Sequence, residues 1–192
     1  MQLAILALGC FWGPEEKLSK IKGITSTEVG YCGGNNTNVT YEEVCGGTTG
    51  HAEVVKLGFD DNIISYEGII RFFFDFHDPT QIDGQGANIG TNYRSEIFYN
   101  SEEQKKTAEK ILNKQNEKFK GKIATKISKE KNYCKAEEYH QKYFEKKSNY
   151  VFIRNYIVVK SKFYNFCMTC GSSTYFFVSN IRIISSTVTN LC

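Results

Sequence analysis

The 192-residue sequence has no long hydrophobic run and no marked excess of charge of one sign. Its longest uncharged stretch, residues 163–181, contains two asparagines and several serines and threonines, a composition unsuited to a membrane helix. The apolar start at residues 3–8 is short and follows no basic region, so we expect no secretory signal. The net charge of +3 comes without a stripe of basic residues interleaved with aromatics, so we expect no nucleic-acid partner. A cytoplasmic, monomeric protein with no membrane association is the expectation.

Histidine is also scarce, with three in the chain, and none lies in a spacing typical of zinc sites. Strand parity would place His51 beside Glu53, which leaves a metal site as an alternative, but the pair has no further ligands in the pattern. Cysteine is abundant by comparison. In a reducing compartment, seven cysteines at irregular spacing are catalytic, metal-bound or buried rather than members of a disulfide framework. They are Cys10, Cys32, Cys45, Cys134, Cys167, Cys170 and Cys192.

With 41% hydrophobic and 23% charged residues, the chain has the composition of a soluble globular protein with a core. Up to residue 148, strand-like and helix-like segments interleave, which predicts an α/β sandwich. The strands are expected at residues 3–8, 24–29, 53–59, 94–98 and 122–127, and the helices from residue 14, at 65–77, from 101 and at 136–146. Residues 149–192 show neither a clear period nor capping signals. We therefore predict a catalytic domain at 1–148 and a divergent C-terminal tail at 149–192.

Cys10 lies where a buried strand should turn into a helix. Gly9 and Gly13 imply a sharp turn, and Pro14 suits the first turn of the helix. Free N–H groups and the positive end of the helix dipole would stabilise a thiolate there. Position alone also fits a small buried cysteine. The neighbouring aromatics Phe11 and Trp12 favour a pocket that accepts a small apolar group, such as a methyl on sulfur.

Glu53 is the candidate acid. The period of two along residues 53–59 places Glu53 on the apolar face of a strand, where loss of water should raise its pKa. A carboxyl group protonated near neutral pH can donate a proton to a developing oxyanion. The alternative is a strand-end glutamate that turns out to solvent.

Several motifs, in this order, resemble those of the A-type peptide methionine sulfoxide reductases. The resemblance covers roughly residues 3–147, and its first motif is highly specific. The matching segments are Gly9-Cys10-Phe11-Trp12-Gly13 with Glu15, Gly30-Tyr31-Cys32-Gly33-Gly34, Thr40-Tyr41-Glu42-Glu43-Val44-Cys45, Thr49-Gly50-His51-Ala52-Glu53, His77-Asp78-Pro79-Thr80-Gln81, Gln85-Gly86, Gly90-Thr91-Asn92-Tyr93-Arg94-Ser95 and Ala136-Glu137-Glu138-Tyr139-His140-Gln141.

The resemblance implies a two-layer, ferredoxin-like α/β (α+β) sandwich that reduces methionine-(S)-sulfoxide, free or in proteins. Cys10 would attack the sulfoxide sulfur while Phe11 and Trp12 hold the substrate methyl. Glu53, assisted by Tyr41 and Tyr93, would protonate the sulfoxide oxygen. The resulting sulfenic acid condenses with a second cysteine, and thioredoxin, or dithiothreitol in the test tube, reduces the disulfide. No metal and no organic cofactor is implied.

The sequence departs from the family in two places. Asn88 stands where relatives have an aspartate, which contributes to the hydrogen-bond network around the sulfoxide oxygen; asparagine carries neither charge nor a labile proton. The tail does not resemble the Gly-rich coil that carries resolving cysteines in many relatives. We therefore take Cys167 and Cys170, and then Cys192, as resolving candidates, and we expect Cys45 to be buried.

Two other functions remain alternatives. A thiol redox sensor would oxidise Cys10 without reducing a sulfoxide, but it needs neither the aromatic pair nor Glu53. A non-catalytic binder of oxidised methionine would not need the intact Cys10.

Overall fold

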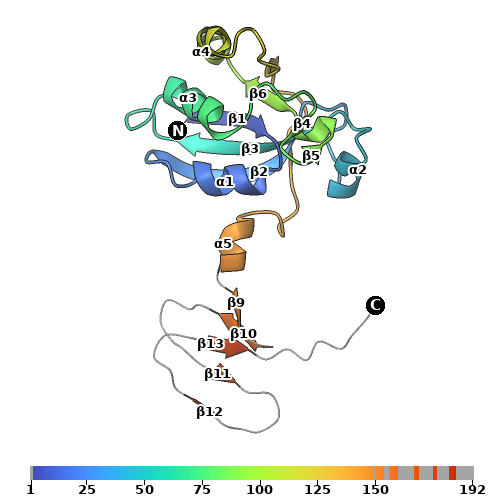
Figure 1. Cartoon of the computed structure of the whole chain (residues 1–192), viewed down its shortest axis with the longest axis vertical. Helices are drawn as coiled ribbons and strands as arrows, with labels where there is room; N and C mark the ends of the chain where they lie inside the picture. Colours follow the sequence, from blue (N-terminus) through green and yellow to red (C-terminus); the bar gives the residue numbers. More distant parts are fainter. Residues whose placement is uncertain are drawn as a thin grey trace. The chain divides into compact units, whose positions relative to one another are not determined.

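The structure is a computed structural model that describes residues 2–148 and, beyond them, the short strands at 150–153, 156–159, 167–168, 175–176 and 182–184. The chain divides into two compact units, Met1–Lys142 and Tyr143–Cys192. Figure 1 shows the elements of both units.

The first unit is built on a six-stranded sheet with the order β7-β6-β1-β3-β2-β8. Its strands are β1 (Gln2–Leu8), β2 (Ile24–Cys32), β3 (Ala52–Phe59), β6 (Ser95–Tyr99), β7 (Lys126–Lys129) and β8 (Cys134–Lys135). All neighbours are antiparallel except β6 and β7. Each predicted strand therefore exists, although β7 covers only the end of the predicted 122–127. A small hairpin of β4 (Gly84–Gln85) and β5 (Asn88–Ile89) and a 3₁₀ turn, Thr91–Tyr93, precede β6.

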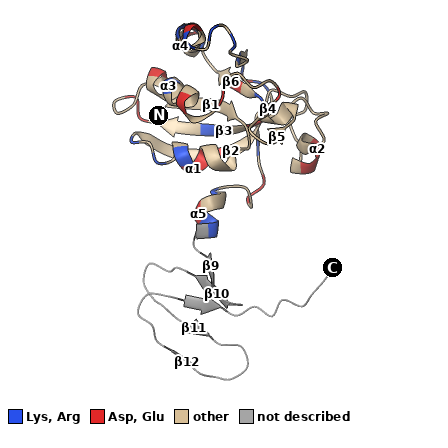
Figure 2. Cartoon of the chain, in the orientation of Figure 1, with Lys and Arg blue, Asp and Glu red and all other residues tan. Residues whose placement is uncertain are grey.

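The helices of this unit are α1 (Trp12–Leu18), α2 (Tyr41–Cys45), α3 (Tyr66–Phe76) and α4 (Glu102–Lys118). The hydroxyl of Ser65 accepts from Gly68 N–H and caps α3, which ends before His77 as predicted. Ser101 caps α4 in the same way. The charged residues that Figure 2 colours along α4 are exposed, except the half-buried Lys105, so the alternating charges mark a solvated face there.

The core lies between one face of the sheet and the helices. Apolar side chains of β1, β2, β3 and β6 pack with those of α1, α3 and α4 on this face. A smaller cluster on the opposite face is backed by Tyr133. The two clusters are made of alanine, valine, leucine, isoleucine, phenylalanine and tyrosine side chains together with Cys32. The broad apolar face of α3 supplies Ile69, Ile70 and Phe73, all fully buried.

The residues of the second unit that the structure describes form α5 (Tyr143–Ser148) and five strands. The strands β9 (Tyr150–Ile153), β10 (Tyr156–Val159) and β13 (Arg182–Ile184) form one antiparallel sheet in the order β13-β10-β9. The strands β11 (Cys167–Met168) and β12 (Tyr175–Phe176) pair with each other. Among the described residues, no helix is long and apolar enough to cross a membrane.

The predicted helix at 136–146 is wrong over residues 136–142. Only α5 is helical, and the preceding residues form turns. The Gln141 carboxamide instead accepts from Val29 N–H and donates to the Val29 and Ala136 carbonyls, and Lys142 N–H donates to Glu15. These side-chain bonds and the bonds to Val29 and Glu15, which are distant in sequence, replace the local i to i−4 bonds of a helix.

Candidate active site

Cys10 lies in the tight turn between β1 and α1, as the sequence predicts. Gly9 has a φ of +86°, and a Cβ at this position would lie 2.5 Å from the Cβ of Gln85 in the hairpin. Only glycine fits this conformation and this close approach. Pro14 lies within the first turn of α1, and the thiol of Cys10 is half-buried at the start of that helix.

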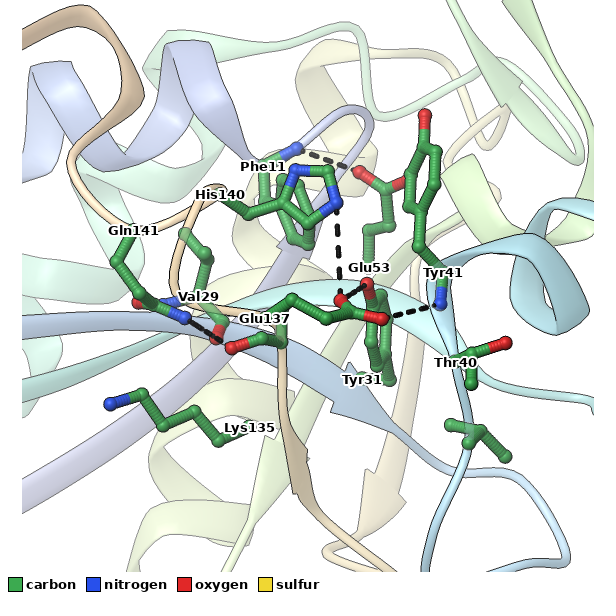
Figure 3. Close-up of polar contacts among 12 residues, drawn as sticks. Phe11, Val29, Tyr31, Thr40, Tyr41, Glu53, Lys135, Glu137, His140 and Gln141 are labelled. Atoms are coloured by element: carbon green, nitrogen blue, oxygen red, sulfur yellow. Dashed lines mark hydrogen bonds and ion pairs between the residues drawn. The ribbon is translucent and has the colours of Figure 1, made fainter. Parts of the chain in front are cut away.

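Glu53 lies in β3 on the core side of the sheet, where it is 1% exposed. The predicted parity is confirmed, and the alternative of a solvent-facing glutamate is wrong. Its carboxylate accepts a 3.1 Å hydrogen bond from the backbone N–H of Phe11, the residue after Cys10 (Figure 3). Burial raises the pKa of Glu53 to about 7, against the opposing effects of Phe11 N–H and of the neighbouring Asn92 side chain. A large share of this carboxyl is therefore protonated near neutral pH.

The thiol of Cys10 lies in surroundings that favour its protonated form. Trp12 N–H donates to its sulfur and lowers the pKa, as expected at a helix start, but burial has the larger effect and raises the pKa to about 11. Glu53 raises it further. The helix start stabilises the thiolate as expected, but burial outweighs this effect, because the thiol and the acid share a poorly hydrated site.

The two aromatics after Cys10 take different positions. Phe11 is 1% exposed and belongs to the core, whereas Trp12 is half-buried. The Phe11 ring lies 5.9 Å from that of Tyr31 and 5.2 Å from that of His140, and the Trp12 ring lies 5.6 Å from that of His140. The site therefore has an aromatic wall continuous with the core.

The structure brings two tyrosines to the same site. The pKa of Tyr41, the first residue of α2, is raised by its hydrogen bond with Cys45 and by burial, with smaller effects of Tyr93 and Glu53. Burial and then Glu53 raise the pKa of Tyr93, and Cys10 contributes further. Both hydroxyls therefore lie within electrostatic reach of Glu53 and stay protonated.

Asn92 is a site residue that the sequence reasoning missed. Its side chain is 3% exposed and lies beside Glu53, whose negative charge it stabilises. The pattern held no signal for it beyond its place next to Tyr93. Asn88, which the sequence singled out, lies in β5 with an exposed side chain.

The other thiols of the first unit differ in how far they are exposed. Cys32 is buried, Cys134 is half-buried, and Cys45 is exposed, contrary to our expectation that it is buried. Cys45 is hydrogen-bonded to Tyr41, and its charge raises the pKa of Cys10, so the two thiols are electrostatic neighbours. Cys167 lies in β11, where the structure does not describe the side chains, and Cys170 and Cys192 lie outside the described residues.

His51 serves the fold of the Gly-rich loop. Its Nε2 lies 2.9 Å from the carbonyl oxygen of Asn36, and its ring occupies the space that a side chain at Gly34 would need. In the part of the chain that the structure describes, no three histidine, cysteine or acidic side chains gather as metal ligands.

The turns at 136–142 contribute a second set of polar groups behind the aromatic wall. The carboxylate of Glu137 accepts from the hydroxyl of Tyr31 and from the backbone N–H of Tyr41, each at 2.9 Å (Figure 3). His140, which is 2% exposed, accepts a 3.1 Å hydrogen bond from the indole N–H of Trp12. Sequence reasoning quoted this segment as a motif but gave none of its side chains a role.

A thiol in a tight turn, a buried acid with a raised pKa beside it and an aromatic wall together define a thiol-dependent oxidoreductase site. Comparison with known proteins then identifies the family. The sequence profile of peptide methionine sulfoxide reductases matches residues 2–168. The chain is 60% identical over 147 residues, 77% of its own length, to the whole of the peptide methionine sulfoxide reductase MsrA of Pelagibacter ubique.

Solved structures give the same result. The fold is similar to that of reduced Mxr1 from Saccharomyces cerevisiae, with a TM-score of 0.74 and 38% identity over 79% of this chain and 88% of that one. It is also similar to Mxr1 in complex with Trx2, with a TM-score of 0.54 and 30% identity over 74% of this chain and 84% of that one. The chain belongs to the peptide methionine sulfoxide reductase family.

Proposed function

We propose that this protein reduces the S epimer of methionine sulfoxide, free or within proteins, to methionine, with Cys10 as the nucleophile. The observation that carries the proposal is the 3.1 Å hydrogen bond from Phe11 N–H to Glu53, which holds an acid with a pKa of about 7 beside the cysteine. The family to which the chain belongs, and the MsrA name of its relatives, support this reaction.

In the reductive step, protonated Glu53 donates to the sulfoxide oxygen while the sulfur of Cys10 attacks the substrate sulfur. The oxygen passes from the substrate sulfur to Cys10, so one S–O bond breaks and one forms. The substrate sulfur gains two electrons and Cys10 loses two. The proton that Glu53 donated stays with the oxygen on the sulfenic acid, and the thiol proton of Cys10 restores Glu53 for the next turnover.

The two tyrosines and the aromatic wall have supporting roles. The protonated hydroxyls of Tyr41 and Tyr93 donate to the sulfoxide oxygen beside Glu53. Phe11 and Trp12 hold the substrate methyl, for which a wall without charge is suited. Asn88 stands in the family's aspartate position and leaves the network one carboxylate short. That loss makes the pH dependence of the step differ from that of relatives.

In the second half of the cycle, a thiol attacks the sulfenic acid, a disulfide forms and water leaves. Cys167, Cys170 and Cys192 remain proposed resolving residues. Cys45 joins them because it is exposed and lies within electrostatic reach of Cys10. Thioredoxin reduces the disulfide by exchange; the complex of the similar Mxr1 with Trx2 supports this partner.

We further propose that the first unit is a ferredoxin-like sandwich. The strand order β6-β1-β3-β2 and the crossover helices α1 and α3 support this fold. A catalytic domain at 1–148 with a tail at 149–192, a cytoplasmic location, a monomeric state and independence from metals and organic cofactors complete the proposal.

An assay on the two separated sulfoxide epimers with dithiothreitol tests the reaction. We expect methionine from the S epimer, none from the R epimer and none with the Cys10→Ser variant. Peroxide consumption that depends on Cys10 and yields no methionine would establish the redox sensor instead. Binding of a sulfoxide peptide without turnover would establish the binder.

A further inference from the structure

The side chain of Trp12 contacts the turn at residues 136–142. Its indole N–H donates to Nδ1 of His140 at 3.1 Å, and the two rings lie 5.6 Å apart. His140 is 2% exposed, and its ring also packs against Phe11 at 5.2 Å and Tyr41 at 4.5 Å. A buried imidazole therefore lies in the middle of the aromatic wall.

The hydrogen bond from Trp12 determines which nitrogen of His140 carries the proton. An indole N–H is only a donor, so Nδ1 must be the acceptor and the proton of the neutral ring lies on Nε2. Burial lowers the pKa of His140, which keeps the ring neutral, against smaller opposing effects of Glu137 and Glu42. Nε2 is buried without a hydrogen-bond partner and lies 3.9 Å from the carboxylate of Glu137.

The carboxylate of Glu137 is itself held in place. It accepts from the hydroxyl of Tyr31 and from the backbone N–H of Tyr41, and its pKa is lowered, so it is ionised at neutral pH (Figure 3). A negative charge on this side of the imidazole favours the tautomer with its proton on Nε2. Glu137 therefore favours the state of His140 in which Nδ1 is free to accept from Trp12.

We propose that Glu137 and His140 are positioning residues, which fix the indole of Trp12 as the wall of the substrate-methyl site. The chain of contacts runs from the carboxylate of Glu137 through the imidazole of His140 to the indole N–H. Through its bond to Tyr41 N–H, the same carboxylate places the first turn of α2. The inference rests on the proposed function for the role of the wall, but the placement of the indole can be measured without substrate.

Because Trp12 is the only tryptophan in the chain, its fluorescence reports this contact directly. We expect His140→Leu, which removes the acceptor, to shift the emission maximum and to make the indole more accessible to acrylamide. His140→Asn keeps an oxygen near the position of Nδ1 and should restore most of both signals. Glu137→Gln should give an intermediate change.

In the reductase assay, we expect His140→Leu to raise KM for the S epimer about fivefold to tenfold, the scale of one lost hydrogen bond, with a smaller effect on kcat. His140→Asn should return KM to within about twofold of the wild type. A rise in KM with little loss of kcat indicates a loss of binding surface rather than of chemistry.

His77→Leu is the matched control. His77 is another histidine of the first unit, and its two ring nitrogens are hydrogen-bonded to the Phe73 carbonyl and the Ser95 hydroxyl rather than to Trp12. It should lower Tm without changing the fluorescence of Trp12 or KM. Unchanged fluorescence in His140→Leu would overturn the proposal, as would equal changes in His77→Leu. If the wild type produced no methionine, the proposed function would fail, while the fluorescence comparison would still decide how Trp12 is held.

Discussion

The backbone N–H of Phe11 donates to the carboxylate of Glu53 across 42 positions of sequence, so the end of β1 and the start of β3 meet at the nucleophile. The contact fixes the acid to the residue that follows Cys10. It also opposes the effect of burial on the pKa of Glu53, although burial remains the larger of the two. Because a backbone donor cannot be removed by an ordinary side-chain substitution, the acid itself is the group to vary.

We expect Glu53→Gln to lower the rate of the reductive step by about 10² to 10³, the usual contribution of a general acid. The glutamine oxygen can still accept from Phe11 N–H, so the turn around Cys10 is kept while the labile proton is lost. Single-turnover release of methionine measures the step. A rate within threefold of the wild type would contradict the role of Glu53.

The same variant should remove a pH dependence of stability that Glu53 gives the wild type. The folded-state pKa of Glu53 is raised from an ordinary 4.5 to about 7, so its contribution to stability is fully present below pH 4.5 and is lost as the pH rises through 7. The loss amounts to roughly 3 kcal/mol at alkaline pH. Urea unfolding at pH 5 and at pH 8 should therefore show that the free energy of unfolding of Glu53→Gln rises relative to that of the wild type as the pH rises. A constant difference between the two proteins would show that Glu53 has an ordinary pKa.

The Asn88→Asp variant introduces the carboxylate that the family resemblance implies at this position. We expect the wild type to be active and the variant to have a shifted pH–rate profile, because the proposed role of this position in the network around the sulfoxide oxygen lets an added carboxylate change the protonation of Glu53. Asn88→Ser serves as the control, since it changes the side chain without adding charge. Identical profiles for the wild type and Asn88→Asp would mean that this exposed residue does not act on the reductive step.

The resolving thiol can be identified by counting thiols after a single turnover without reductant. We expect the wild type to lose two thiols and Cys45→Ser to stop at a sulfenic acid that dimedone captures, because Cys45 is the exposed neighbour of Cys10. The turnover rate of Cys45→Ser with thioredoxin should fall, whereas its turnover rate with dithiothreitol should match that of the wild type. If Cys167→Ser or Cys170→Ser stops at the sulfenic acid instead, the role belongs to the second unit.

Much of the fold could be predicted because local patterns and tertiary packing agree over most of the first unit. The period of two placed Glu53 on the core side, and Ser65 and Ser101 mark the helix starts that the structure has. The helix predicted at 136–146 is absent over residues 136–142, because hydrogen bonds from Gln141 to the distant strand β2 outweigh the local preference for a helix.

The protonation of the site could not be predicted from position in the chain. A helix start lowers the pKa of a thiol, and the sequence shows the helix start, but it does not show how much water the folded site excludes. For Cys10 that exclusion is the larger effect. The contacts of Asn92 with Glu53 and of Trp12 with His140 could not be predicted for a related reason. Each contact joins segments that are far apart in sequence and are brought together by the folded sheet.

The composition of the core has a consequence for a protein that works where oxidants are present. Oxidation turns a methionine side chain into a polar one and loosens the packing around it. The sequence has methionine only at positions 1 and 168, and the buried clusters of the first unit are filled by aliphatic and aromatic side chains. Among the residues that the structure describes, no methionine belongs to the buried clusters that support Cys10, so we expect peroxide that creates substrate to spare the packing of these clusters.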